Sequence, residues 1–333
     1  MPTDDKGVLG VKVQEDTLSG QSIICFAGED WWYHHPHSKN HILKRLARQN
    51  KVLFVNSLTM GLPARSNPDF FAKIRRKLRS MMRWLRRAPE GLWVMTPVVV
   101  PLYSFSFTRW LNRMILRLQL RIVQRLLGLN NPVVWVAVPS AAEVIDYVGA
   151  QVVLYQVSDK YEANQDSATS ASLIREWDRA LKLNAAVVMY SGRKLFEEAT
   201  EPHRYFLEQA VDFEHFARAD VEPAADIRHI PRPILGYFGW MDYVMDGNLV
   251  AEVARLRPNW HWVFIGNKSN LFEVNGPNIH FLGSKPYGDL PRYLRAIDVC
   301  VLPWREDVFT SYGSAIKVKE YLATGKPVVI SPL

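Results

Sequence analysis

Short runs of apolar residues recur along the chain, and most are separated by segments whose apolar residues repeat at helical spacing. Short runs rich in Val, Ile and Phe predict buried strands. In the first part of the chain these runs lie at 22–27, 51–56, 133–138, 152–155 and 185–190. In the second part they lie at 234–239, 261–266, 278–283, 299–303 and 328–330.

Helices are predicted between these runs. They lie at 41–48, 72–87, 108–127, 192–199, 249–255, 290–296 and 315–324, and a further helix begins at Ser140. Strands that alternate with helices form βαβ units, whose strands are parallel. The pattern therefore predicts an α/β protein, and a length of 333 residues suggests two domains.

Composition divides the chain into four parts. Residues 1–20 are polar and partly acidic, and they predict a disordered lead-in without a signal peptide. Residues 21–216 would form the first domain and residues 234–333 the second. The segment 217–233 between them is rich in Ala, Pro and charged residues, which is typical of a linker.

The last predicted helix, 315–324, is a candidate anion site. Gly313 and Ser314 precede it, and Ser314 is a favourable N-cap residue. The free backbone N–H groups of a helix N-terminus attract phosphate. Lys317 and Glu320 share one face of this helix, where a cation suits a diphosphate and a carboxylate can accept hydrogen bonds from ribose hydroxyls. The alternative is a solvent-exposed ion pair, worth a few tenths of a kcal/mol.

The far end of this helix is also predicted by its sequence. Leu322 and Ala323 would face inward, and Gly325 and Pro327 would end the helix. The run 328–330 would then be a buried strand.

The loop at 28–39 follows the first predicted strand. Ligands of open parallel sheets bind beyond the carboxyl ends of the strands. The loop contains two carboxylates, two tryptophans and three histidines: Glu29, Asp30, Trp31, Trp32, His34, His35 and His37. The histidines match no helical metal-ligand spacing and no cysteine joins them, so no metal is predicted. Contacts to a sugar or lipid-phosphate acceptor, or a surface loop without function, remain open.

Asp159 follows the strand 152–155 in the same way. We expect Asp159 and Asp30 to be the catalytic candidates, for acceptor binding or as a base. The alternative for Asp159 is a carboxylate that only caps its own loop.

The net charge of +8 implies an anionic partner. Residues 72–87 contain eight Lys or Arg and no acid, with apolar residues at helical spacing. Such a basic amphipathic helix is typical of a helix on anionic lipid. A nucleic-acid surface and a plain solvated face are the alternatives, but no zinc-finger, RRM or helix-turn-helix pattern supports nucleic acid.

The predicted helix 108–127 is basic as well. Arginines recur every four residues, at Arg109, Arg113, Arg117, Arg121 and Arg125. Such spacing gives a stripe that winds slowly around a helix. The opposite, core-facing side is predicted to hold Leu111, Met114, Ile115, Leu118 and Ile122. A core helix with a solvated basic face is the alternative to lipid contact, but both basic helices fall in the first domain, which favours membrane docking by that domain.

The lack of a long apolar run and the small number of cysteines indicate where in the cell the protein is located. No apolar run reaches the roughly 18 residues that a bilayer-spanning helix needs. Cys25 and Cys300 lie within apolar runs and are predicted to be buried hydrophobes, not a disulfide or metal site. We therefore expect a cytoplasmic protein, peripheral on the inner face of the cell membrane.

Three segments of the second domain resemble one known family in the same order and spacing. They are NIHFLG at 278–283, YLRAIDVCVLPW at 293–304 and KVKEYLATGKPVV at 317–329. They resemble bacterial glycosyltransferases with the GT-B fold, close to glycosyltransferase family 4, of the type that builds teichuronic acid or exopolysaccharide. The first domain resembles the family more loosely.

The resemblance implies two Rossmann-like domains with parallel sheets that face each other across a cleft. It also implies that Glu320 grips the nucleotide ribose and that the strand–loop at Gly239 and Trp240 contacts the donor. Tyr312 stands where the family has an additional glutamate. The resembled enzymes usually continue with more helix after the last strand, so a truncated C-terminal domain is expected.

The resulting prediction is a glycosyltransferase that moves a sugar from a UDP- or GDP-linked donor to a lipid-linked or cell-surface glycan. It would be metal-independent, retaining and without a cofactor, with the helix N-terminus and Lys317 stabilising the leaving diphosphate. The main alternative is a non-catalytic member that binds nucleotide sugar or glycan within a polysaccharide assembly. A nucleotide-cofactor oxidoreductase is less favoured, because no G-x-G-x-x-G follows a strand.

Overall fold

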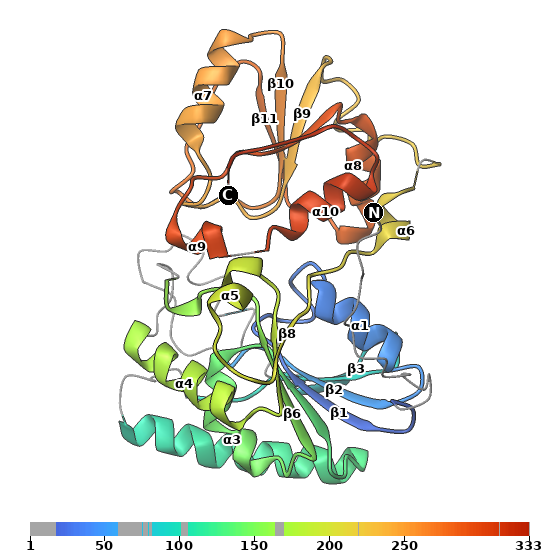
Figure 1. Ribbon diagram of the computed structural model, residues 1–333. Coiled ribbons are helices and arrows are strands. Elements are labelled where there is room, and N and C mark those ends of the chain that lie inside the picture. The colour runs from blue at the N-terminus through green and yellow to red at the C-terminus, as the bar shows by residue number, and fades with distance from the viewer. Residues whose placement is uncertain are drawn as a thin grey trace, which may run out of the picture.

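The computed structural model describes residues 18–58, 75, 79, 82–100, 106–163, 170–218, 220–312 and 314–332. Two α/β halves lie one above the other, and each half has its own sheet with helices around it (Figure 1). Below, the N-terminal half means the described residues up to 212, and the C-terminal half means those from 213 onward.

The sheet of the N-terminal half has the order β3-β4-β2-β1-β5-β6-β7-β8 among the described residues. Its strands are β1 (Ser22–Phe26), β2 (Lys51–Val55), β3 (Leu85–Arg87), β4 (Trp93–Met95), β5 (Val133–Val136), β6 (Val152–Val157), β7 (Val187–Tyr190) and β8 (Arg204–Phe206). All neighbours pair in parallel except β3 and β4. The predicted parallel sheet is therefore confirmed.

The sheet of the C-terminal half has the order β11-β10-β9-β12-β13, with every pair parallel. Its strands are β9 (Ile234–Phe238), β10 (His261–Ile265), β11 (Ile279–Gly283), β12 (Val299–Leu302) and β13 (Val328–Ile330). This is the doubly wound arrangement of nucleotide-binding α/β proteins.

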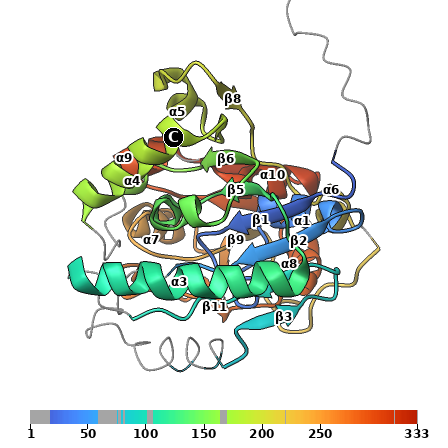
Figure 2. The same ribbon diagram turned by 90° about the horizontal axis from the view of Figure 1, so that it is seen from below.

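Helices cover both sheets. They are α1 (Ser38–Leu46), α3 (Ser106–Leu127), α4 (Ala171–Asn184), α5 (Arg193–Glu198), α6 (Phe213–Phe216), α7 (Gly247–Leu256), α8 (Leu290–Ala296), α9 (Val308–Tyr312) and α10 (Ile316–Ala323). Single 3-10 turns lie at Pro139–Glu143, Ile145–Tyr147, Tyr161–Ala163 and Tyr287–Asp289. Seen from below, α3 runs across the face of the N-terminal half (Figure 2).

Each sheet packs on both faces, and the described residues form four apolar clusters. In the N-terminal half, α3 packs on the face that contains Ile24 and Phe26, and α1 packs on the face that contains Cys25 and Phe54. Both cysteines are free and fully buried, as predicted.

The end of the predicted helix 72–87 is wrong, and most of its other residues lie outside the described part of the chain. Leu85–Arg87 form β3, which pairs antiparallel with β4. The turn between them is closed by Ala88 N–H donating to the Leu92 carbonyl oxygen at 2.8 Å, and Gly91 has a φ of +95°. The proline and glycine of this turn are hairpin signals that outweigh the helical spacing.

The α-helix predicted from Ser140 is also wrong. The segment forms two 3-10 turns with Val144 between them, which has a φ of −135° and is fully buried. That φ lies outside the helical range. Val144 is β-branched and fully buried, and its non-helical backbone interrupts the helix.

Helix α3 forms at the predicted position, but its predicted buried face is wrong. Leu118 and Ile122 are exposed, whereas Leu116, Leu120 and Val123 pack in the core. Successive residues turn by about 100°, so these two sets lie on opposite sides of the helix. Both sides are apolar in sequence, and only the contact with the sheet decides which one is buried.

Strand β13 was predicted to be buried, and this is wrong for its outer residues. It is the edge strand of its sheet, and Val329 and Ile330 are exposed. An edge strand has a neighbour on one side only, so apolar composition alone does not bury it.

The predicted linker 217–233 packs against the C-terminal half. Ala224, Ile227 and Ile230 are buried in the same cluster as Phe216 of α6. Three apolar side chains among charged neighbours are enough to attach the segment to this core. The exact limits of the two domains stay a prediction.

Gly266, just past β10, is expected to tolerate no side chain. It has a φ of +140°, and a Cβ there would lie 1.9 Å from the carbonyl oxygen of Gly239. Gly266→Ala should lower the free energy of unfolding by about 2 kcal/mol or more, because backbone strain and overpacking each cost on the order of 1–3 kcal/mol. Urea denaturation measures this change.

Gly288→Ala is the matched control in the same half. A Cβ at Gly288 would meet nothing within 4 Å, so its effect should stay within about 0.5 kcal/mol. Equal denaturation midpoints for the two variants would contradict the close approach of Gly239 and Gly266.

Candidate active site

Two loops leave their sheets where strand connections change direction. In the C-terminal sheet β9 lies between β10 and β12, and in the N-terminal sheet β1 lies between β2 and β5. Such switch points leave a crevice at the carboxyl edge of the sheet, where ligands bind. The loop after β1 reaches the C-terminal half, because the His35 Nε2 lies 3.1 Å from the carbonyl oxygen of Lys285.

Gly239 ends β9 at the switch point of the C-terminal sheet. It has a φ of +149°, and a Cβ there would lie 2.8 Å from the Tyr237 hydroxyl and 3.3 Å from Lys317 Cε. The position therefore leaves no room for a side chain, and the Gly239 N–H donates to the Ile265 carbonyl oxygen at 2.9 Å. Trp240 follows and is half-exposed, with its carbonyl oxygen accepting a hydrogen bond from the Tyr237 hydroxyl at 2.9 Å.

Lys317 and Glu320 form a buried ion pair in the first turns of α10. Lys317 Nζ lies 2.8 Å from Glu320 Oε2, and their side chains are 17% and 5% exposed. Lys317 Nζ also lies 4.6 Å from the ring centre of Phe238, at the end of β9. The alternative of a solvent-exposed pair is therefore excluded.

The electrostatics of this pair favour a ligand that carries charge. Burial raises the pKa of Glu320 above its usual value, and Lys317 opposes part of that rise. A buried ion pair loses much of its attraction to desolvation. New hydrogen bonds from a ligand would offset that loss.

The start of α10 differs from its prediction. Ala315 is the N-cap residue and Ser314 precedes it, with the Ser314 carbonyl oxygen accepting from Ile316 N–H at 2.8 Å. Gly313 lies outside the described residues. Leu322, predicted to face inward, is exposed, whereas Tyr321 and Ala323 are buried. The Tyr321 hydroxyl accepts from the Phe238 N–H at 3.2 Å and so fixes α10 to β9.

Asp159 follows β6 and lies on the N-terminal side of the site. Burial raises the pKa of this carboxyl to about 6, and Lys39 opposes part of the rise. Lys39 itself pairs with the buried Glu29 at 2.8 Å. Burial alone would raise the pKa of Glu29, but Lys39 and His37 hold it below its usual value.

Asp30 has different surroundings from Asp159. Its Oδ1 accepts from Trp32 N–H at 2.9 Å, and its Oδ2 accepts from Asn56 Nδ2 at 3.1 Å. Asn56 is buried and donates onward to Thr96 Oγ1 at 2.9 Å. These bonds hold the loop in place, whereas Asp159 lines a cavity.

The three histidines of the loop point to different partners. His34 Nδ1 accepts from Asp30 N–H at 3.0 Å, whereas His35 reaches Lys285 of the other half. Burial, with Lys39 nearby, lowers the pKa of His37 to about 4, so this ring is neutral at physiological pH. Among the described residues, no three His, Cys, Asp or Glu side chains are placed to hold a metal.

A cavity of about 300 Å³ opens beside Asp159. It lies at the carboxyl ends of β6 and β7 and includes one residue from the C-terminal half, Tyr312. Its lining is Val157, Asp159, Lys160, Glu162, Asp178, Lys182, Tyr190, Leu195, Glu198, Ala199, Thr200, Glu201 and Tyr312. Hydroxyl and carboxylate groups of this kind can bind a polyhydroxylated molecule.

Tyr312 is held firmly at the rim of this cavity. Its hydroxyl donates to Glu198 Oε1 at 2.7 Å. The ammonium groups of Lys160 and Lys194 lie 4.0 and 4.2 Å from its ring centre. The Tyr312 carbonyl oxygen approaches Gly192 so closely that a Cβ added to Gly192 would lie 2.3 Å from it. Tyr312 thus joins α9 of the C-terminal half to the N-terminal half.

Sequence reasoning missed Lys39, Glu198 and Gly266. Each contacts residues that are not its neighbours in the sequence, so no local spacing rule predicts its role. Gly266 alone had a usable signal, because it is the last residue of a predicted strand, as Gly239 is.

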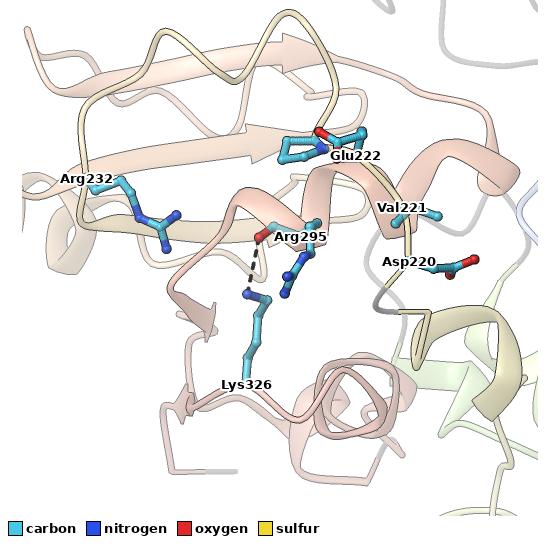
Figure 3. A pocket seen from close by; sticks show the side chains of 7 residues that line it. Asp220, Val221, Glu222, Arg232, Arg295 and Lys326 are labelled. Atoms are coloured by element: carbon cyan, nitrogen blue, oxygen red, sulfur yellow. Dashed lines mark hydrogen bonds between the residues drawn. The ribbon is translucent and has the colours of Figure 1, made fainter.

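A second pocket, of about 480 Å³, lies on another part of the C-terminal half (Figure 3). Asp220, Val221, Glu222, Pro223, Arg232, Arg295 and Lys326 line it. Arg232 pairs with Asp298, and Lys326 Nζ donates to the Arg295 carbonyl oxygen at 3.4 Å. It contains none of the predicted site residues.

Known structures share this arrangement of two sheets. Sucrose-phosphate synthase from Thermosynechococcus elongatus matches 94% of this chain and 82% of its own, with a TM-score of 0.62 at 14% identity. HepE from Anabaena, solved with UDP and glucose, matches 93% and 80%, with a TM-score of 0.59 at 12% identity. The fold is GT-B. Its two Rossmann-like domains are the two halves described above.

Sequence comparisons agree for the C-terminal half of the GT-B fold. A family model described as glycosyl transferases group 1 matches residues 232–333. A protein of Bacillus subtilis (strain 168), named as the teichuronic acid biosynthesis glycosyltransferase TuaH, is 26% identical over 130 residues. That match covers 37% of this chain and 33% of the relative's length.

The pKa of Asp159 predicts a pH-dependent stability. The carboxyl is protonated more readily in the folded than in the unfolded chain, so stability falls as the pH rises from the usual carboxyl pKa of 3.8 to about 6 and stays lower above it. Asp159→Asn stays neutral, so it should be more stable than wild type at pH 8 by about 1–3 kcal/mol. The difference should shrink towards pH 4, as urea denaturation at several pH values would reveal.

Asp220→Asn is the control, since the Asp220 side chain is 80% exposed. It should leave the pH dependence of stability unchanged. An Asp159→Asn variant less stable than wild type at pH 8 would show that the carboxylate is stabilising, contrary to the raised pKa.

Proposed function

We propose that the protein is a glycosyltransferase that uses a nucleotide diphosphate sugar as donor. The observation that carries the proposal is the buried Lys317–Glu320 pair at the start of α10, packed against Gly239 at the switch point of the sheet. This site lies inside the segment that matches glycosyl transferases group 1. The resemblance to glycosyltransferase family 4 is part of the same proposal.

The donor would bind with its diphosphate at the N-terminus of α10. The positive end of the α10 dipole and the Lys317 ammonium would stabilise the charge that develops on the leaving diphosphate. Glu320 would accept hydrogen bonds from the ribose hydroxyls. Because these groups supply the stabilising charge, the proposed reaction is metal-independent and uses no cofactor.

The acceptor would enter from the N-terminal side, next to Asp159. The ionised carboxylate would accept a hydrogen bond from the acceptor hydroxyl and hold it near the sugar. We propose a retaining reaction, in which an oxygen of the leaving phosphate takes the proton from that hydroxyl. In an inverting reaction Asp159 would itself be the base.

The proposed donor is UDP- or GDP-linked, and the proposed acceptor is a lipid-linked or cell-surface glycan. HepE was solved with UDP and glucose, and the relative from Bacillus subtilis is named for teichuronic acid biosynthesis. The first supports a nucleotide sugar as the class of donor, and the second supports a glycan as the class of acceptor. A lipid-linked acceptor would place the protein on the inner face of the cell membrane, with the basic helix α3 of the N-terminal half towards the lipid.

A non-catalytic nucleotide-sugar or glycan-binding role is the second candidate. The observation in its favour is Tyr312, which occupies the place of a family glutamate and whose hydroxyl is engaged by Glu198. Turnover of a donor sugar separates the two. An oxidoreductase is less favoured, and binding of NAD alone, without any nucleoside diphosphate, would support it.

Glu320→Gln should weaken the binding of one nucleoside diphosphate by about 10- to 100-fold. A hydrogen bond to a charged group contributes about 1.5–3 kcal/mol, and the variant also leaves Lys317 without its partner. Titration calorimetry with UDP, GDP, ADP and NAD measures both the affinity and the choice of base.

Glu273→Gln makes the same chemical change at an exposed position in the same half and should leave binding unaltered. Equal affinities of wild type and Glu320→Gln for the nucleoside diphosphate would contradict the assignment of the donor site.

Asp159→Asn should lower kcat by about tenfold or more, because a hydrogen bond to a charged group contributes about 1.5–3 kcal/mol, while the donor affinity changes little. Wild-type turnover should rise with pH through about 6, as the Asp159 carboxyl ionises, and the variant should lose this rise. Release of nucleoside diphosphate in the presence of acceptor is the measurement. Unchanged turnover in Asp159→Asn would remove this residue from the mechanism.

A further inference from the structure

The outward side of α3 is apolar along most of its length. Five large apolar side chains on it are exposed: Phe107 (69%), Trp110 (49%), Leu118 (61%), Ile122 (41%) and Leu126 (66%). Arg121 and Arg125 are exposed on the same helix. These seven residues are called the outer face of α3 below.

This face is unusual for a helix at the surface of a soluble domain. Such a helix has one apolar stripe towards the core and a polar side towards water. Here the core stripe is already provided by Leu116, Leu120 and Val123. Single exposed apolar residues are ordinary, but a continuous row on one helix indicates a surface that another molecule covers.

The charges of α3 indicate which kind of molecule covers its outer face. The helix contains five arginines and no acidic residue. Arg113 turns to Glu143, with its Nε 3.4 Å from Oε2, and Arg117 lies 4.7 Å from the ring centre of Tyr147. Arg121 and Arg125 stay on the outer face. The partner must therefore offer both hydrocarbon and negative charge.

We propose that the outer face of α3 docks on the surface of an anionic lipid bilayer. Acyl chains would cover the apolar side chains, and lipid phosphates would meet Arg121 and Arg125. The rings of Phe107 and Trp110 stack with centroids 5.9 Å apart at the start of the helix. Aromatic side chains of this kind favour the boundary between lipid and water.

A second copy of the chain fits the face less well. It would bring two sets of arginines together across an apolar contact, and like charges in an interface are repulsive. A bilayer-spanning role does not fit α3, since none of the helices within the described residues is both long and apolar enough to cross a membrane. The helix would lie in the plane of the lipid surface.

The position of α3 suits this role. It lies on the side of the N-terminal half that is remote from the C-terminal half (Figure 1). Docking through it would leave the two switch-point loops uncovered. The purpose of this docking rests on the proposed function, because a lipid-linked acceptor requires a membrane. Lipid binding itself is measured without any turnover.

Co-sedimentation of the full chain with vesicles tests the inference. Binding to phosphatidylcholine vesicles that contain phosphatidylglycerol should exceed binding to phosphatidylcholine alone. Leu118→Gln should lower the partition coefficient about tenfold, because a buried leucine contributes about 1.5–3 kcal/mol. Arg121→Gln with Arg125→Gln should remove most of the preference for anionic vesicles.

Leu256→Gln is the matched control. Leu256 is an exposed leucine at the end of α7 in the other half, so this variant should bind vesicles as wild type does. Equal vesicle binding by Leu118→Gln and wild type would overturn the proposal. So would a wild-type dimer that Leu118→Gln converts to a monomer, because a second copy would then cover the face.

Donor binding by calorimetry, run on the same samples without vesicles, keeps the two proposals separate. Normal donor affinity without vesicle binding would refute only the docking of α3. Vesicle binding without donor affinity would refute only the proposed transfer reaction.

Discussion

Parallel strand pairing is the constraint on which the rest of the structure depends. A parallel strand needs a crossover connection, and the crossovers around β1 and around β9 leave in opposite directions. The carboxyl ends of these two strands therefore stay open. Gly239 and Gly266 approach each other at one opening, and the loop with Glu29 and Asp30 fills the other.

Polar and aromatic side chains of the described residues form contacts between the halves. The rings of His41 and Tyr287 have centroids 5.9 Å apart, and His35 reaches Lys285. Lys319 pairs with Glu208 at 2.9 Å. Partly exposed pairs of this kind each contribute on the order of 0–1 kcal/mol. The interface therefore aligns the two openings without fusing the two cores.

The sequence predicted those parts of the molecule that depend on neighbours along the chain. Strand runs, the glycine after β9 and the pair at Lys317 and Glu320 are local signals, and the structure brings that glycine and that pair together. The two faces of α3 could not be told apart, because both are apolar and only the sheet selects one. Likewise, no spacing rule links Lys39 to Asp159, since the fold alone brings them together.

Tyr312 gives the molecule a property that neither half has alone. It forms the rim of the cavity beside Asp159, yet only four residues separate it from Lys317. In the proposed function, a molecule that fills the cavity would contact the same short segment that leads to the diphosphate site. Binding at the two places would then be linked, and by thermodynamic reciprocity each occupant would change the affinity of the other by the same factor. Tyr312 and its hydrogen bond to Glu198 would provide that link.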